Sequence, residues 1–189
     1  VPASSGKDLA DAVPGLGDIA PLEFVQFSNI ASPGMTPQNM WDLHCKIEEL
    51  LARDDVAGVV VTHGTDTLEE TSFFLDITAK SQKPVVRTAA MRGASDISPD
   101  GPFNIYCSVK TAASPQAVGM GVMVCLDEIL QAPGEVMKTH SANPATFQSP
   151  WWGPIGYVDI DHIVWRRKVL GVKRFHPQAL TARVDLVKC

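Results

Sequence analysis

A run of valines, followed at once by a polar turn and a helical repeat, is the feature that most constrains the fold of this chain. Residues 59–61 are all valine, which is typical of a strand buried on both faces of a parallel sheet. The turn THGTD follows, and Leu68, Thr71 and Leu75 then recur at helical spacing. Residues 59–75 therefore predict a strand, a turn and a helix.

The turn of this unit carries hydroxyl and carboxylate side chains, namely Thr62, Thr65 and Asp66. In open α/β sheets, ligands bind where a strand ends and a helix begins. Thr67 and Glu70 match a capping box, and Glu69 adds negative charge to the first helical turn. Any strand–turn–helix junction needs small polar residues, so these local features fit a structural loop as well as a binding site.

Strand and helix patterns alternate along most of the chain. We expect strands at 23–30, 59–61, 83–89 and 118–126, short strand-like pieces at 129–130 and 136–137, and a hairpin at 157–165 turned at 159–162. We expect helices at 9–13, at 102–112 and after Thr36, with Pro37 as the first helical residue. Residues 184–187 resemble a strand that has just begun. This alternation predicts an α/β fold with a Rossmann-like or flavodoxin-like parallel sheet flanked by helices.

Composition and charge exclude several classes of protein. The 189 residues are 45% hydrophobic, as in ordinary globular proteins. A net charge of −5 argues against a nucleic-acid partner, and no apolar run is long enough to span a membrane. The only basic cluster, residues 166–168, is expected to be a solvated linker.

The cysteines and histidines indicate no metal site. Cys45, Cys107, Cys125 and Cys189 show no CxxC spacing, and no HExxH motif occurs. We expect buried free thiols and a site without a metal or other cofactor.

Five segments together resemble the bacterial asparaginases, especially the type II, glutaminase-asparaginase branch. THGTDTLEET is similar to the second signature of that family, and SPGMTPQNMWDL resembles its substrate-carboxylate loop and following helix. KPVVRTAAMRGASDISPDGPFNIYCSV is similar to a further block of the family. VMKTHSANPATFQSP resembles the segment with the active-site lysine, and FQSPWWGPIGYVD resembles the hairpin after it. The resemblance covers nearly the whole chain and implies the N-terminal domain of an asparaginase.

The resemblance implies an amidohydrolase that converts L-asparagine to L-aspartate and ammonia. Amide hydrolysis without a metal needs an activated nucleophile, a base and donors for the oxyanion. Thr65 is the candidate hydroxyl, and Lys138 is the candidate proton acceptor, since a desolvated lysine can be tuned towards neutrality. Asp66 would hold the lysine or bind a cationic group of the substrate. Taken alone, Lys138 also fits a solvated surface lysine.

Substrate-binding roles follow from the same resemblance. Ser32 would hold the α-carboxylate of the substrate, Asp66 would bind its α-ammonium group, and the backbone near Ala90 would contact its side-chain amide. Pro33 stands where some family members have a glutamine that contacts substrate. Without the resemblance, Ser32 is an ordinary loop serine. Asn104 and Tyr106 are expected to be structural helix residues.

The sequence also departs from the family pattern. The family's first strand carries a TGGTIA-type motif whose threonine is usually considered the acyl-accepting nucleophile, and the mobile loop after it supplies a tyrosine; neither occurs here. We therefore expect a partial asparaginase, with an N-terminal domain at 1–166, a linker at 167–183 and the start of a C-terminal domain at 184–189. The first strand would lie inside the sheet, so we expect an exposed hydrophobic edge, marginal stability and little or no activity.

Other functions remain open at this point. A glutaminase, or the asparaginase-like subunit of a tRNA-dependent amidotransferase, would keep the family and change the reaction. A non-catalytic amino-acid-binding protein would use Ser32 and Asp66 as a clamp. A structural flavodoxin-like domain would leave THGTD and Lys138 unexplained. The resemblance implies a homotetrameric parent, a dimer of dimers. It favours the periplasm, with the cytoplasm as the alternative.

Overall fold

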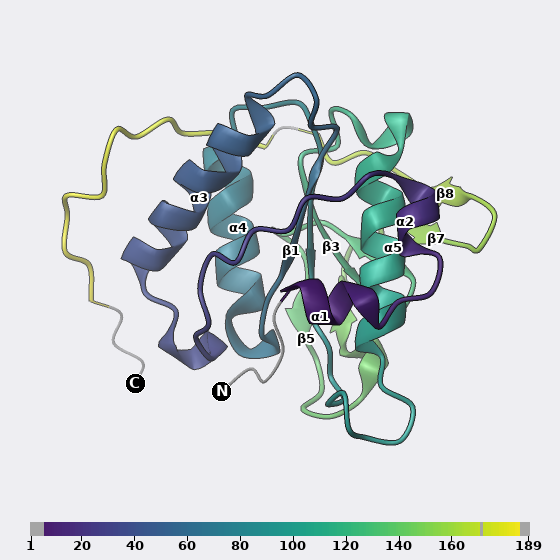
Figure 1. Ribbon diagram of the computed structural model, residues 1–189. Coiled ribbons are helices and arrows are strands. Elements are labelled where there is room, and N and C mark those ends of the chain that lie inside the picture. The colour runs from purple at the N-terminus through teal and green to yellow at the C-terminus, as the bar shows by residue number, and fades with distance from the viewer. Residues whose placement is uncertain (1–5, 171, 186–189) are drawn as a thin grey trace.

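A six-stranded sheet runs through the molecule, and helices cover both of its faces (Figure 1). The computed structural model describes residues 6–170 and 172–185. The strand order is β1-β2-β3-β4-β7-β8, and a separate small sheet pairs β5 with β6. The strands are β1 (Val59–Thr62), β2 (Val85–Thr88), β3 (Val122–Leu126), β4 (Ile129–Gln131), β5 (Met137–Lys138), β6 (Phe147–Gln148), β7 (Gly156–Val158) and β8 (Ile163–Trp165). The α-helices are α1 (Gly6–Asp11), α2 (Leu16–Ile19), α3 (Pro37–Leu51), α4 (Leu68–Thr78) and α5 (Gly101–Ala113).

The α/β architecture predicted from the sequence is confirmed, and the sheet is mixed. β1, β2 and β3 are parallel, whereas β4, β7 and β8 are antiparallel to their neighbours. The predicted hairpin is confirmed as β7 and β8, closed by a hydrogen bond from Asp159 N to His162 O of 2.8 Å. Four short 3-10 helices, η1 (Ser32–Gly34), η2 (Thr65–Thr67), η3 (Pro115–Ala117) and η4 (Pro144–Thr146), lie in the connections.

Two helical layers form because successive side chains of each strand point to opposite faces of the sheet. On one face, Val85 packs in a cluster with Ile47 of α3 and Leu75 of α4. On the other face, Val86 packs in a cluster with Cys107 of α5. The short helices α1 and α2 pack against the outer side of α5 through a cluster of apolar residues: Val13, Leu16, Ile105 and Val109.

The start of α3 is as predicted. Thr36 Oγ1 accepts a hydrogen bond of 3.1 Å from Asn39 N, and Asn39 Oδ1 accepts one of 3.0 Å from Thr36 N. These two bonds form a capping box that satisfies backbone N–H groups at the helix start. Pro37 is the first helical residue, where its lack of an N–H costs nothing.

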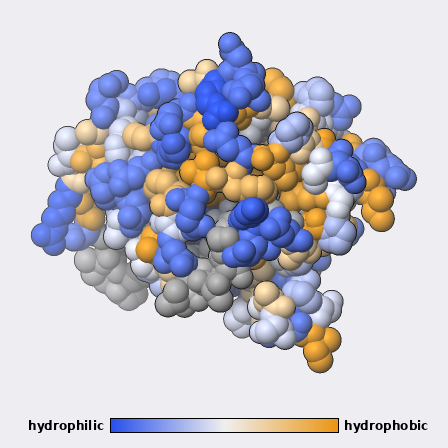
Figure 2. Space-filling model, in the orientation of Figure 1, coloured by the Kyte–Doolittle hydropathy of each residue, from blue (hydrophilic) through white to orange (hydrophobic). Residues whose placement is uncertain are grey.

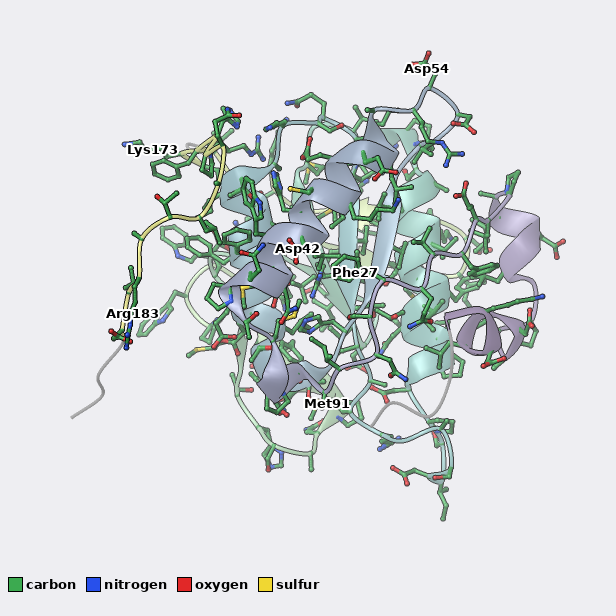
Figure 3. All side chains as sticks on the ribbon, turned by 60° about the vertical axis from the view of Figure 1, so that its left-hand side comes forward. Phe27, Asp42, Asp54, Met91, Lys173 and Arg183 are labelled. Carbon is green, nitrogen blue, oxygen red and sulfur yellow. The ribbon has the colours of Figure 1, made fainter. Side chains whose placement is uncertain are left out.

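The predicted strand at 23–30 is wrong. Residues 21–31 have no regular secondary structure, and their apolar side chains are exposed, with Phe24 at 46% and Phe27 at 39% (Figure 3). Figure 2 shows hydrophobic atoms across the middle of the face where Figure 1 places this segment. The alternation of apolar residues is present, but a strand also needs a neighbouring strand to pair with, and no strand within 6–170 and 172–185 pairs with this segment.

Two expectations about the central unit are corrected. β1 is an edge strand, because β2 is the only strand that pairs with it among the described residues, and its valines pack against apolar clusters on both faces but are only partly buried. Thr67 and Glu70 form no capping box. The short helix η2 precedes α4, and the Thr67 hydroxyl donates instead to Ser32 O at 2.8 Å.

The smaller expectations are confirmed in part. Cys107 and Cys125 are buried free thiols as predicted, whereas Cys45 is exposed on α3, and Cys189 lies outside the described residues. The cluster at 166–168 is not wholly solvated, because Arg167 forms a partly buried ion pair with Glu135. Residues 184 and 185 are irregular, and the rest of the strand expected at 184–187 lies outside the described range. No helix in that range is long and apolar enough to cross a bilayer.

We predict that Thr36→Ala lowers the free energy of unfolding by about 1 kcal/mol, because the side-chain acceptor for Asn39 N is lost. Urea unfolding followed by circular dichroism measures the change. Thr181→Ala is the matched control, since Thr181 is exposed outside regular structure and its loss should stay within about 0.5 kcal/mol. Equal values for the two variants would show that the cap contributes nothing.

Candidate active site

The candidate site lies where the parallel strands end. Thr62 of β1 is in register with Thr88 of β2, and His63 N donates to Thr88 O at 2.8 Å. The loops that follow the two strands, 63–67 and 89–100, therefore leave the same edge of the sheet. This is the edge at which open α/β sheets bind their ligands.

Three side chains meet directly at this edge. Lys138 Nζ donates to Thr65 Oγ1 and to Asp66 Oδ1, each at 2.9 Å. The Lys138 side chain is 21% exposed and that of Asp66 is 57% exposed, so the ion pair is open to solvent on the carboxylate side. The structure thus brings together Thr65, Asp66 and Lys138, although more than 70 residues separate the lysine from the other two.

The backbone of Lys138 is held by the helix that follows Thr65 and Asp66. Lys138 N donates to the carboxylate of Glu69 in the first turn of α4. Lys138 also pairs with Phe147 across β5 and β6, and Thr139 N donates to Thr146 O at 2.8 Å. The sequence pattern predicts only that Glu69 interacts favourably with the helix dipole. No local signal reveals its contact with Lys138, because the two residues are 69 positions apart.

Ser32 lies against the same loop. Ser32 is buried, its Oγ accepts a hydrogen bond of 3.2 Å from Asp66 N, and its carbonyl accepts the bond from Thr67. Gly64 makes this close approach possible, since a Cβ built on Gly64 would lie 2.5 Å from Ser32 Oγ. Pro33 is the next residue of η1 and is exposed.

The loop after β2 is held by two polar residues of α5 and its start. Asp100 accepts hydrogen bonds from Met91 N and Arg92 N, at 3.0 and 2.9 Å (Met91 is labelled in Figure 3). Asn104 Nδ2 donates to Ala89 O at 3.0 Å, and its Oδ1 accepts from Asp127 N at 2.9 Å. Asn104 is thus a structural helix residue, as expected, and it also ties together the loops after β2 and β3.

Among the described residues, two of the predicted site residues, Ala90 and Pro33, make no hydrogen bond with Thr65, Asp66 or Lys138. Ala90 is exposed in the loop after β2 and packs against Gly101 of α5. The roles of Ala90 and Pro33 in binding stay predictions.

His63 is a neighbour of the site that sequence reasoning missed. Its Nδ1 lies 2.7 Å from Gly64 O, and its Nε2 lies 3.4 Å from Thr71 Oγ1. Burial, and then the positive charge of Arg87, lower the pKa of His63 to about 4. The imidazole is therefore neutral near pH 7 and stabilises the loop by hydrogen bonding.

The site places an amine beside a hydroxyl and a carboxylate beside the amine, which are groups that acyl transfer can use. In its amine form, Lys138 Nζ can accept the proton of the Thr65 hydroxyl across the same 2.9 Å. No group of three or more His, Cys, Asp or Glu side chains within 6–170 and 172–185 is arranged to hold a metal ion.

We predict that Gly64→Ala costs about 1–3 kcal/mol of stability, because the new methyl group meets Ser32 Oγ and Ser32 Cβ at 2.5 and 2.8 Å. Gly34→Ala is the control, since no atom lies within 4 Å of a Cβ at that position. Chemical unfolding of the two variants measures the difference. A Gly64→Ala protein as stable as the parent would rule out the close packing of η1 on this loop.

We predict that His63 makes the protein acid-sensitive. Its folded pKa of about 4 lies below the ordinary value of 6.5, so its contribution to stability is complete above pH 6.5 and is lost as the pH falls towards 4. Between these pH values, His63→Gln should lose roughly 1–3 kcal/mol less stability than the parent. His162→Gln, on the exposed hairpin turn, should keep the parental pH dependence. Identical pH profiles for all three proteins would contradict the prediction.

The chain is similar to known proteins over most of its length. The sequence model of the family described as "Asparaginase, N-terminal" matches residues 1–170. The chain is 43% identical over 155 residues to L-asparaginase 2 of Bacillus subtilis, covering 82% of this chain and 41% of that protein. It is 38% identical over 161 residues to the glutaminase-asparaginase of Pseudomonas fluorescens biotype A, covering 85% of this chain and 44% of that protein.

A solved structure extends the comparison to the fold. The crystal structure of a probable cytoplasmic L-asparaginase from Campylobacter jejuni superposes with a TM-score of 0.87 at 39% sequence identity. The match covers 93% of this chain and 56% of that chain. The chain thus spans less than half the length of the curated relatives it matches. From the family model, the sequence identity and the shared fold together, the chain belongs to the asparaginase family and corresponds to its N-terminal domain.

Proposed function

We propose that the protein hydrolyses the side-chain amide of L-asparagine to L-aspartate and ammonia, and that Thr65, Lys138 and Asp66 perform the proton transfers. The observation that carries this proposal is the contact of Lys138 Nζ with both Thr65 Oγ1 and Asp66 Oδ1. Lys138 contacts a hydroxyl and a carboxylate at the ligand-binding edge of the sheet. These contacts fit a catalytic lysine better than a solvated surface lysine.

The proton transfers follow from these distances. Lys138, as the free amine, takes the proton of the Thr65 hydroxyl, and the Thr65 oxygen takes a proton from the attacking water molecule. The attacking oxygen bonds to the amide carbon, and the carbon–nitrogen bond breaks. The proton on Lys138 returns through Thr65 to the departing nitrogen, which leaves as ammonia. Asp66 holds the lysine in line with Thr65 throughout.

Substrate binding is proposed for five positions at this centre: Ser32, Pro33, Thr65, Asp66 and Ala90. The carboxylate of Asp66 is more than half exposed, which suits a ligand ammonium group. Ser32 adjoins Asp66 through the bond from Asp66 N and would bind the α-carboxylate. The backbone near Ala90 would contact the side-chain amide, and Pro33 would border the site. The Asp100 and Asn104 bonds hold the Ala90 loop for this purpose.

Glutamine is a second candidate substrate, because one relative is a glutaminase-asparaginase. The extra methylene of glutamine would displace its amide relative to Thr65 if the α-carboxylate and α-ammonium groups stay on Ser32 and Asp66. The ratio of kcat/KM for asparagine and glutamine decides between the two. Binding of aspartate without any turnover would instead indicate an amino-acid-binding protein.

We further propose that residues 1–166 form the N-terminal domain, that 167–183 are a linker and that 184–189 begin a second domain of a homotetrameric parent. The family model for the N-terminal domain, which ends at residue 170, supports the first boundary. The described residues after β8, 166–170 and 172–185, have no regular secondary structure, which supports the second assignment.

We predict that Thr65→Ala and Lys138→Met each lower ammonia release from L-asparagine by about 10³-fold or more. Little turnover is expected of the 189 residues alone. The assay therefore uses a chimera in which the matching part of this chain replaces the 155-residue region of the Bacillus subtilis relative. Lys46→Met on α3, which pairs with Glu49 away from the site, is the control and should retain activity. Activity that survives either site substitution would remove that residue from the mechanism.

A further inference from the structure

A charged side chain lies in the core with no partner. Arg87 is the third residue of β2, and its exposed fraction is 0%. None of its three guanidinium nitrogens has a hydrogen-bond acceptor in the described part of the chain. A guanidinium carries five N–H donors and a full charge, and burying it without an acceptor or a counter-charge is costly. Something other than the neighbouring apolar side chains must offset this cost.

The position of Arg87 is defined by the residues on either side of it along β2. Val85, Arg87 and Ala89 share one face of the sheet, because side chains alternate along a strand. Val85 packs in a cluster with Leu75, and Ala89 packs in a cluster with Leu68. Leu68 and Leu75 are two turns apart on α4. Arg87 therefore faces the middle of α4, between its two apolar contacts with the sheet.

A second unpaired polar group lies on that part of α4. Ser72 is fully buried, and its Oγ has no partner in the described part of the chain. The neighbouring hydroxyl of Thr71 is already used, since it donates to Thr67 O at 2.8 Å. Two orphaned donors, the Arg87 guanidinium and the Ser72 hydroxyl, thus belong to the same interface between α4 and β2.

The carboxylates of α4 are engaged elsewhere or exposed. Glu69 accepts from Lys138 N, and Asp76 pairs with Arg174 at the other end of the helix. Glu70 is exposed. His63, whose pKa the charge of Arg87 helps to lower, is neutral near pH 7 and supplies no negative charge. Among the described residues, therefore, neither His63 nor a carboxylate of α4 supplies the counter-charge.

We propose that Arg87 and Ser72 bind a small inorganic anion of the size of chloride between α4 and β2. The anion accepts N–H donors from the guanidinium and the O–H donor of Ser72, which satisfies both groups and neutralises the charge. Leu68 and Leu75 pack in clusters with Ala89 and Val85 on either side of Arg87, and this close packing favours a monatomic anion over a larger oxyanion. The site lies in the core behind the Thr65 loop and is independent of the proposed hydrolysis.

The test is the chloride dependence of thermal unfolding. Sodium chloride replaces sodium gluconate at constant ionic strength, so that general screening does not change. Above the dissociation constant, each tenfold rise in chloride should raise the Tm of the parent by about 3–5 °C. Arg87→Met should abolish this dependence and Ser72→Ala should weaken it. Arg53→Met, which alters an exposed arginine paired with Glu23 and Asp55, should leave it unchanged.

A second measurement needs no variant, in case Arg87→Met does not fold. Chlorine-35 NMR of the parent protein should show a broadened chloride line that narrows when bromide is added as a competitor. A Tm that is equal in chloride and gluconate would overturn the proposal. It would mean that water, and not an anion, accepts the hydrogen bonds of Arg87 and Ser72. Chloride dependence that persists in a folded Arg87→Met protein would overturn it as well.

Discussion

Parallel pairing of β1 with β2 and of β2 with β3 is the constraint on which the rest of the structure depends. The pairing sends the loops after these strands to one edge, where the backbone N–H groups and side chains of two separate segments can converge. It also sets which side chains face α4 and which face α5. Both the candidate site at the edge and the buried arginine behind it are consequences of that register.

Helix α4 connects these two features. Its first turn holds Lys138 through Glu69, beside the Thr65 and Asp66 that precede the helix. Its middle turn carries Thr71 and Ser72, which face the sheet at the level of Arg87. His63 lies between the site loop and Thr71, and the charge of Arg87 adds to burial in lowering the pKa of His63. Helix α4 therefore holds Lys138 in the candidate site and packs over the buried guanidinium of Arg87.

Sequence reasoning succeeded where a pattern is local and failed where a partner is distant. The cap at Thr36 was predictable because both members of the box lie within one turn. The same kind of pattern at Thr67 gave a wrong prediction, because the Thr67 hydroxyl donates to the carbonyl of Ser32, 35 residues away. Residues 23–30 have the apolar alternation of a strand, but a strand forms only with a neighbour to hydrogen bond. Glu69 and Ser72 carried no readable signal, because their surroundings come from other segments.

The sequence by itself determined the α/β class, the family and the residues that lie at the end of β1, because periodicity and motif are properties of neighbouring residues. Only the tertiary structure decided that Lys138 reaches Thr65 and Asp66 at 2.9 Å, that β1 is an edge strand and that Arg87 is buried without a partner. Distances, strand order and burial depend on contacts between segments that are far apart in the chain. No local pattern of residues encodes them.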